Sequence, residues 1–160
     1  MEAPVCSWVV LSWLPESVES IMIARVETVT PKEPLEHAWM KMVERNIGSV
    51  VVIEGNNPVG IITERDISRC LAKGVQALNT RVENIMSSPL ITTTRSAGIE
   101  EIMQTMLKHG IRRLPVVDEG MLVGIVSDRD LLRWVLRIRH EPHISPAIRE
   151  ILDRQPFSKT

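Results

Sequence analysis

Cysteine is scarce in this sequence, and the two that occur stand far apart. Cys6 and Cys70 are the only cysteines among 160 residues, and neither belongs to a CxxC pair. A structural zinc site needs closely spaced ligands, and a disulfide framework needs several cysteines. The sequence therefore predicts neither of these, although a single bridge between Cys6 and Cys70 stays open.

The chain also lacks a strong net charge. It has 19 lysine and arginine residues against 20 aspartate and glutamate residues, so its formal net charge is -1 at pH 7. A general nucleic-acid-binding protein carries a strongly basic field. We therefore expect any basic site to be local, and we do not expect nucleic acid to be the main partner.

A long apolar run is missing as well. The most apolar stretch, Val5 to Leu14, is shorter than the roughly 20 residues that a membrane-spanning helix needs. The residues ahead of it, Met-Glu-Ala-Pro, lack the basic charges of a secretory signal. We therefore expect a cytoplasmic protein without a membrane partner. In it, Trp8 and Trp13 cover an apolar surface of the same chain or of a partner subunit, with weak membrane anchoring as the alternative.

Patterns of catalytic and metal-binding residues are also absent. The sequence has no glycine-rich phosphate loop and no evident set of nucleophile, base and orienting residue. His140 and His143 are three residues apart, but Pro142 lies between them and no third ligand is evident. The sequence therefore predicts a protein that is not an enzyme and has no metal site.

What the sequence does contain is an internal repeat. Ile21-Met22 recurs as Ile85-Met86, and GIITERD at 60–66 recurs as GIVSDRD at 124–130. Both pairs are separated by 64 residues, so the segments between them have equal lengths in the two copies. The sequence therefore predicts a duplicated unit. Its divisions are an N-terminal apolar segment at 1–17, repeat 1 at 18–75, repeat 2 at 82–139 and a C-terminal tail at 140–160.

Periodicity predicts the elements inside each copy. Apolar residues at helical spacing predict an amphipathic helix, and two apolar runs around a turn predict a hairpin after it. A second helix starts at the GIITERD or GIVSDRD motif, and a short strand at 26–30 or 90–94 comes first, which makes a β-α-β-β-α unit. The residues assigned to apolar helix faces are Leu35, Ala38, Trp39, Met42, Val43, Ile67, Leu71, Ile99, Ile102, Met103, Met106, Leu107, Leu131, Leu132, Val135 and Leu136.

A single unit of this kind is poorly protected from water. At about 60 residues it buries little apolar surface, and two helices cover only one face of a three-stranded sheet. We therefore expect an α+β fold in which the two copies pack sheet against sheet about a pseudo-twofold axis. Such packing creates two related clefts, and clefts between domains are common ligand sites.

These features resemble cystathionine-beta-synthase-type (CBS) domains. Each copy has Ile-Met before its first strand and a Gly-Ile-Ile/Val-Thr/Ser-Glu/Asp-Arg-Asp motif at the start of its last helix, and the second copy also has Leu-Pro-Val-Val-Asp at 114–118. The resemblance covers residues 18 to 139. It implies a tandem pair, or Bateman module, that binds AMP, ADP or ATP as a regulatory ligand. It further implies a homodimer that acts on a protein the sequence does not identify.

The resemblance also implies site residues in both clefts. The motif acids contact ribose with a hydroxyl residue beside each, arginines reach the phosphate, and residues of the first strand and the helix end enclose the adenine. These residues are Asp66, Asp130, Thr63 and Ser127 for ribose, Arg65, Arg129, Arg112 and Arg113 for phosphate, and Val26, Thr28, Ile47, Leu90, Thr92 and Ile111 for adenine, with Pro115 beside them.

The chemistry of the motif residues agrees with this assignment. Thr63 and Ser127 stand where a strand gives way to a helix, so the hydroxyl and the free N–H groups can meet a ligand oxygen. A positively charged arginine in the first turn is unfavourable, because the N-terminal end of the helix dipole is also positive. A bound phosphate would make the same arginine favourable. The alternative is a capping box, in which Ser or Thr and the acid three residues later satisfy the helix end without a ligand.

The two clefts are expected to differ, and two other functions stay open. Repeat 1 has Gly48-Ser49 where repeat 2 has Arg112-Arg113. One alternative function is a scaffold that binds no ligand. The other is nucleic-acid binding through a basic last helix, whose basic residues are Arg133, Arg137, Arg139 and His140.

Overall fold

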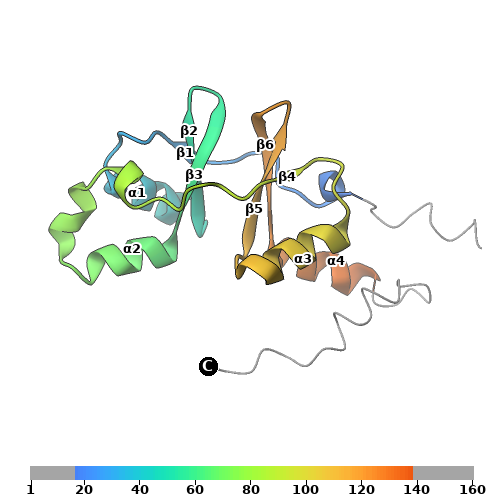
Figure 1. Cartoon of the computed structure of the whole chain (residues 1–160). Coiled ribbons are helices and arrows are strands. Elements are labelled where there is room, and N and C mark those ends of the chain that lie inside the picture. Colours follow the sequence, from blue (N-terminus) through green and yellow to red (C-terminus); the bar gives the residue numbers. More distant parts are fainter. Residues whose placement is uncertain (1–16, 139–160) are drawn as a thin grey trace, which may run out of the picture.

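A computed structural model describes residues 17–138 as two units, each with a three-stranded sheet and two helices. The sheets stand next to each other, with α1 and α2 beside one and α3 and α4 beside the other (Figure 1). Each unit follows the order β-α-β-β-α, which confirms the predicted fold class. Cys6, Trp8, Trp13 and the tail from residue 139 lie outside the described residues.

Corresponding elements occur at corresponding places in the two repeats. In the first unit they are β1 (Thr28–Val29), α1 (Leu35–Arg45), β2 (Ser49–Glu54), β3 (Asn57–Thr63) and α2 (Glu64–Leu71). In the second they are β4 (Thr93–Thr94), α3 (Ile99–His109), β5 (Arg113–Asp118), β6 (Met121–Ser127) and α4 (Asp128–Ile138). Three short 3-10 turns are η1 (Val18–Ser20), η2 (Val75–Asn79) and η3 (Val82–Asn84). Among residues 17–138, no helix is long and apolar enough to cross a membrane.

Each sheet combines one parallel and one antiparallel pairing. β1 lies parallel to β2, with Val29 opposite Val52, and β2 pairs antiparallel with β3. The second sheet repeats this arrangement, with Thr93 opposite Val116 in the parallel pair. The register shifts directly after Val52 and directly after Val116. The duplication in the sequence therefore extends to the register of the strands.

Each unit has its own apolar core between its sheet and its helices. In the first unit, Leu35, Ala38 and Met42 of α1 are buried against the sheet. In the second unit, α3 contributes the equivalent residues, and Trp134 of α4 is 1% exposed. Cys70 is free and buried in the first core. The main helix faces predicted from periodicity are therefore buried.

Four residues assigned to apolar helix faces are exposed instead, so those assignments were wrong. Val43 and Leu107 are 61% and 60% exposed, because Met42 and Met106 just before them take the inward positions. Successive helical residues differ in direction by about 100°. On α4, Leu131 and Trp134 fill the core, which leaves Leu132 and Leu136 pointing to solvent at 58% and 49% exposure.

The first strands are also shorter than predicted, because the chain before each one belongs to the other unit. Val18, Ile21 and Met22 precede the first unit but pack in the core of the second. Ile23 pairs with Ile125 of β6 through two backbone hydrogen bonds of 2.9 and 3.0 Å. In Figure 1 the blue chain accordingly starts beside α3 and crosses to the first sheet.

The second repeat returns the same contact to the first. Val82, Ile85 and Met86 pack in the core of the first unit, and Ser87 pairs with Ile61 of β3. The two repeats thus exchange their leading segments. Each sheet therefore pairs, at its edge strand, with one residue of the other repeat's leading segment, which connects the two units.

The glycine of each GI motif makes room for the exchanged methionine. A Cβ on Gly60 would lie 2.5 Å from Met86 Sδ, and one on Gly124 would lie 2.7 Å from Met22 Sδ. Carbon and sulfur cannot approach so closely without displacement of one of them. The glycines at these positions therefore allow the backbone of β3 and β6 to approach the exchanged segments.

Gly60→Ala is predicted to lower the free energy of unfolding by about 1–3 kcal/mol, the usual cost of overpacking a core. Urea denaturation would measure the loss. In a Met86→Ala background, where the obstructing side chain is gone, the same change should cost much less. An equal loss in both backgrounds would show that Met86 is not what excludes a side chain at position 60.

Candidate ligand-binding clefts

Two cavities are lined by residues from both repeats. Cleft A holds the Ser127–Asp130 motif together with residues 23, 25–27 and 46–49 of repeat 1. Cleft B holds Thr63, Arg65 and Asp66 together with Ser87 and residues 110–113 of repeat 2. An apolar extension of cleft B, formed by Pro89, Leu90, Ile91 and Pro115, shares Ile111 and Arg113 with it. These are the two related clefts expected between the repeats.

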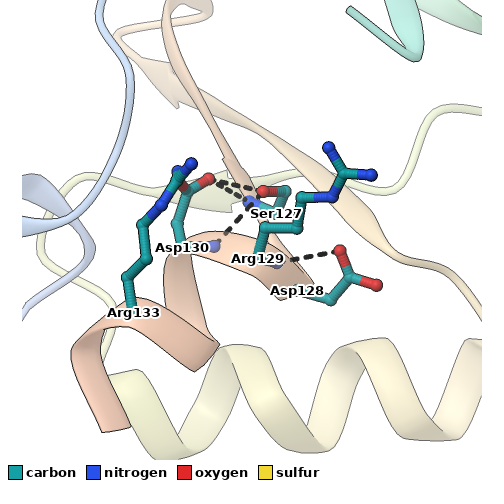
Figure 2. Close-up of polar contacts among 5 residues, drawn as sticks. All are labelled: Ser127, Asp128, Arg129, Asp130 and Arg133. Carbon is teal, nitrogen blue, oxygen red and sulfur yellow. Dashed lines mark hydrogen bonds and ion pairs between the residues drawn. The ribbon is translucent and has the colours of Figure 1, made fainter. Parts of the chain in front are cut away.

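The motif acids bond to their own strand-to-helix junctions. Asp130 Oδ2 accepts hydrogen bonds from the Ser127 N–H at 3.0 Å and from Ser127 Oγ at 2.5 Å (Figure 2). Asp66 Oδ2 accepts the equivalent bonds from Thr63, at 2.9 and 2.6 Å. The capping interaction considered from sequence is therefore present in both motifs. It occupies only one oxygen of each carboxylate.

The second carboxylate oxygen differs between the clefts. Asp130 Oδ1 accepts a hydrogen bond from Arg133 Nη1 at 3.0 Å. Arg69 is the equivalent of Arg133, but no hydrogen bond or ion pair joins it to Asp66 among the described residues. One oxygen of Asp66 is therefore open to a ligand, whereas a ligand of Asp130 has to share or displace Arg133.

Arginines line both clefts in excess over their acidic neighbours. Within residues 17–138, no carboxylate oxygen lies within 4.0 Å of the guanidinium nitrogens of the following cleft arginines. They are Arg25, Arg65, Arg69, Arg112, Arg113 and Arg129. In the view of Figure 2, the guanidinium groups of Arg129 and Arg133 lie on opposite sides of the Ser127–Asp130 pair. Such cations are available to an anionic ligand.

Arg113 lies between the two clefts and lines both of them. Its guanidinium passes so close to Gly48 that any side chain there would collide with Nη2. Burial lowers the pKa of Arg113, and the charge of Arg112 lowers it further, while Asp128 and Glu64 act in the opposite direction. The partly desolvated cation is therefore one that a bound anion would stabilise.

Most residues expected at a nucleotide site lie in these cavities. Thr28 and Thr92 line none of the clefts in the described part of the chain. The Thr28 carbonyl instead accepts a bond of 2.6 Å from Lys41 Nζ, and Thr28 pairs with Val51 in the sheet. Cleft A contains Val26, Ile47, Arg113, Ser127, Arg129 and Asp130, and cleft B with its extension contains Thr63, Arg65, Asp66, Leu90, Ile111, Arg112, Arg113 and Pro115.

Three cleft arginines were missing from the sequence prediction. Arg69 and Arg133 each lie three residues after a motif acid and 64 residues apart, so an extended search of the repeat would have found them. Arg25 lies in the segment that crosses to the other unit, which no repeat pattern indicates. The sequence places Arg133 on a basic helix face, whereas in the structure it lines cleft A and is paired with Asp130. The other basic residues of that helix cannot be compared with the prediction: the side chain of Arg137, and the whole of Arg139 and His140, lie outside the described residues.

Together, the duplicated β-α-β-β-α fold, the exchanged segments and the twin clefts define a tandem-repeat module. The sequence matches the family described as the CBS domain twice, over residues 18–73 and 82–137. The chain therefore belongs to the CBS domain family and contains a tandem CBS pair.

Known proteins of similar sequence or structure agree with this assignment. The CBS domain-containing protein YhcV of Bacillus subtilis is 38% identical over 116 residues, which are 72% of this chain and 82% of YhcV. The structure of CBSX2 in complex with AMP gives a TM-score of 0.69 at 27% identity, covering 78% of this chain and 99% of CBSX2. The CBS domain pair of MJ0100, in complex with 5′-methylthioadenosine and S-adenosyl-L-methionine, gives 0.67 at 28% identity, covering 73% and 93% of the two chains.

Asp130→Ala is predicted to lower the free energy of unfolding by about 1 kcal/mol in the absence of ligand, because the start of α4 loses its capping carboxylate. Arg133→Ala should cost less, about 0.5 kcal/mol, since the Arg133 side chain is largely exposed and the buried Asp130 keeps its bonds to Ser127. Urea denaturation of both variants would measure these losses. A larger loss for Arg133→Ala would show that the ion pair, and not the cap, stabilises this turn.

Proposed function

We propose that this CBS pair is a regulatory module that binds the adenine nucleotides AMP, ADP or ATP in clefts A and B, and that it has no catalytic activity. The observation that carries the proposal is the repeated arrangement of a helix-capping carboxylate with several arginines, of which only Arg133 has a carboxylate within 4.0 Å among the described residues. A carboxylate oxygen suits a ribose diol, and guanidinium groups suit phosphate. Each cleft therefore offers a carboxylate for the ribose and guanidinium groups for the phosphate of one nucleotide.

In cleft A, the ribose would lie against Asp130 and Ser127. The apolar side chains of Val26 and Ile47 line the same cavity and offer a surface for the adenine. Arg129 and Arg113 would then face the phosphate. Arg133 would move from Asp130 towards the ligand, which is a small change because this side chain is largely exposed.

In cleft B, the open oxygen of Asp66 would accept the ribose hydroxyls. The apolar extension, which includes Leu90, Ile111 and Pro115, would hold the adenine. Arg65 and Arg112 line the polar part of the cavity and would contact the phosphates. This cleft therefore offers a separate surface for each part of a nucleotide.

The structures of related CBS pairs support an adenosine-containing ligand. CBSX2 was solved with AMP, and the MJ0100 pair with 5′-methylthioadenosine and S-adenosyl-L-methionine. All three of these ligands contain adenine and ribose, whereas their remaining groups differ. We infer that the adenosine part is the shared element and that the arginines of this chain select the phosphate.

The regulatory effect would come from the exchanged segments. Each cleft is lined by both repeats, so a ligand that bridges them would restrict their relative movement. We propose that this change, in the cytoplasm, alters association with a regulated protein. The exposed Val43, Leu107, Leu132 and Leu136 on the helices would support a homodimer.

Thermal unfolding with AMP, ADP, ATP and S-adenosyl-L-methionine, and with GMP as the control, tests the proposal. An adenine nucleotide at 100 times its dissociation constant adds about 2.7 kcal/mol and should raise the midpoint by roughly 5 to 11 °C. The shift should disappear in the double variant Asp66→Ala, Asp130→Ala, which lacks both ribose contacts. Circular dichroism would verify that this variant is folded.

Absence of any shift, in protein shown to be free of bound nucleotide, would contradict the proposal and favour a scaffold. In that case the two alanine substitutions would still lower the stability but would change no binding. A shift of equal size with GMP would contradict the selectivity for adenine.

A further inference from the structure

The two clefts carry different charge. Cleft A is lined by four arginines and three carboxylates, namely Glu27, Asp128 and Asp130. Cleft B is also lined by four arginines, but Asp66 is its only carboxylate. The excess of positive charge is therefore larger in cleft B. Among these arginines only Arg113 is partly buried, so solvent and salt screen the charges of the others.

The arginines of cleft A are also more fully used. Arg133 is bonded to Asp130 at 3.0 Å, whereas the equivalent Arg69 in cleft B has no carboxylate within 4.0 Å in the described part of the chain. Within residues 17–138, cleft A therefore has one free guanidinium group fewer than cleft B for a second or third phosphate. Glu27, at the edge of cleft A, is paired at 3.4 Å with Arg45, which does not line the cleft and offsets part of the Glu27 charge.

One pair of equivalent positions accounts for much of the difference in charge between the two clefts. Position 48 of repeat 1 lines cleft A, and its equivalent, position 112 of repeat 2, lines cleft B. The first is Gly48 and the second is Arg112. A side chain at 48 would meet the guanidinium of Arg113, which would have to move to make room for it. Arg113 thus occupies the space beside Gly48 in cleft A, whereas Arg112 adds a further cation to cleft B.

We propose that cleft B selects nucleoside di- and triphosphates and cleft A selects the monophosphate, with Arg112 as the residue that sets the difference. The inference rests on the proposed function, because it assumes that both clefts bind adenine nucleotides. Each extra phosphate adds negative charge that the surplus arginines of cleft B can meet. In cleft A the same charge would lie near Glu27 and Asp128.

Isothermal titration of single-cleft variants tests this inference. Asp130→Ala removes the ribose contact of cleft A and leaves cleft B, and Asp66→Ala does the reverse. In Asp130→Ala, ATP should bind at least roughly tenfold more tightly than AMP, the effect of one added charge-assisted hydrogen bond. In Asp66→Ala, AMP should bind as tightly as ATP or more tightly.

Arg112→Gln tests whether Arg112 sets the difference in nucleotide preference between the clefts, and Arg113→Gln is its matched control. Arg112→Gln should weaken ATP binding to cleft B roughly tenfold, with little effect on AMP, and should leave cleft A unchanged. Arg113→Gln should weaken ATP binding in both single-cleft variants, because Arg113 lines both clefts. Circular dichroism of each variant would verify folding.

Equal ratios of ATP to AMP affinity in the two single-cleft variants would overturn the inference, and so would an equal effect of Arg112→Gln on both clefts. A cleft that binds neither nucleotide, while the other binds, would overturn it as well. Loss of all nucleotide binding in the unmodified protein is a different result, since it would contradict the proposed function itself.

Discussion

The exchange of leading segments between the repeats is the constraint on which the rest of the structure depends. Each three-stranded sheet gains one isolated bridge at its edge strand from the leading segment of the other repeat, whose Ile-Met pair packs where Gly60 or Gly124 has no side chain. The exchange joins two small cores that would bury little surface alone. It also brings residues 23–27 next to the motif of repeat 2 and Ser87 next to the motif of repeat 1. The clefts are a consequence of the exchange.

Within each cleft, the same motif serves the helix and offers a ligand site. One oxygen of Asp66 or Asp130 caps the following helix; the other has no hydrogen-bond partner among the described residues in Asp66 and accepts a hydrogen bond from Arg133 in Asp130. A capping role and a binding role are therefore compatible, because a carboxylate has two oxygens and the cap uses only one. The cap also holds the side chain in one position before a ligand arrives, which reduces the conformational entropy that binding would otherwise lose.

Sequence reasoning predicted the architecture well because it rests on period and repetition. Leu35, Ala38 and Met42 recur at helical spacing, and the offset of 64 residues defines the duplicated unit. The errors came where burial depends on a neighbour that the pattern does not contain. Val43 and Leu132 are apolar but exposed, since Met42 and Leu131 next to them fill the core. Thr28, which is predicted to lie at the adenine, lines neither cleft and pairs with Val51 in the sheet.

The sequence by itself determined the repeat, the elements of each unit, the motif residues Thr63, Asp66, Ser127 and Asp130, and the substitution of Gly48 for an arginine. These are local or periodic features, which chain connectivity fixes. Only the tertiary structure decided that leading segments change partners, that Arg25 and Arg133 enter cleft A, and that Arg113 stands between both clefts. Those facts depend on contacts between residues far apart in the chain, and no spacing in a single sequence records which distant surfaces will meet.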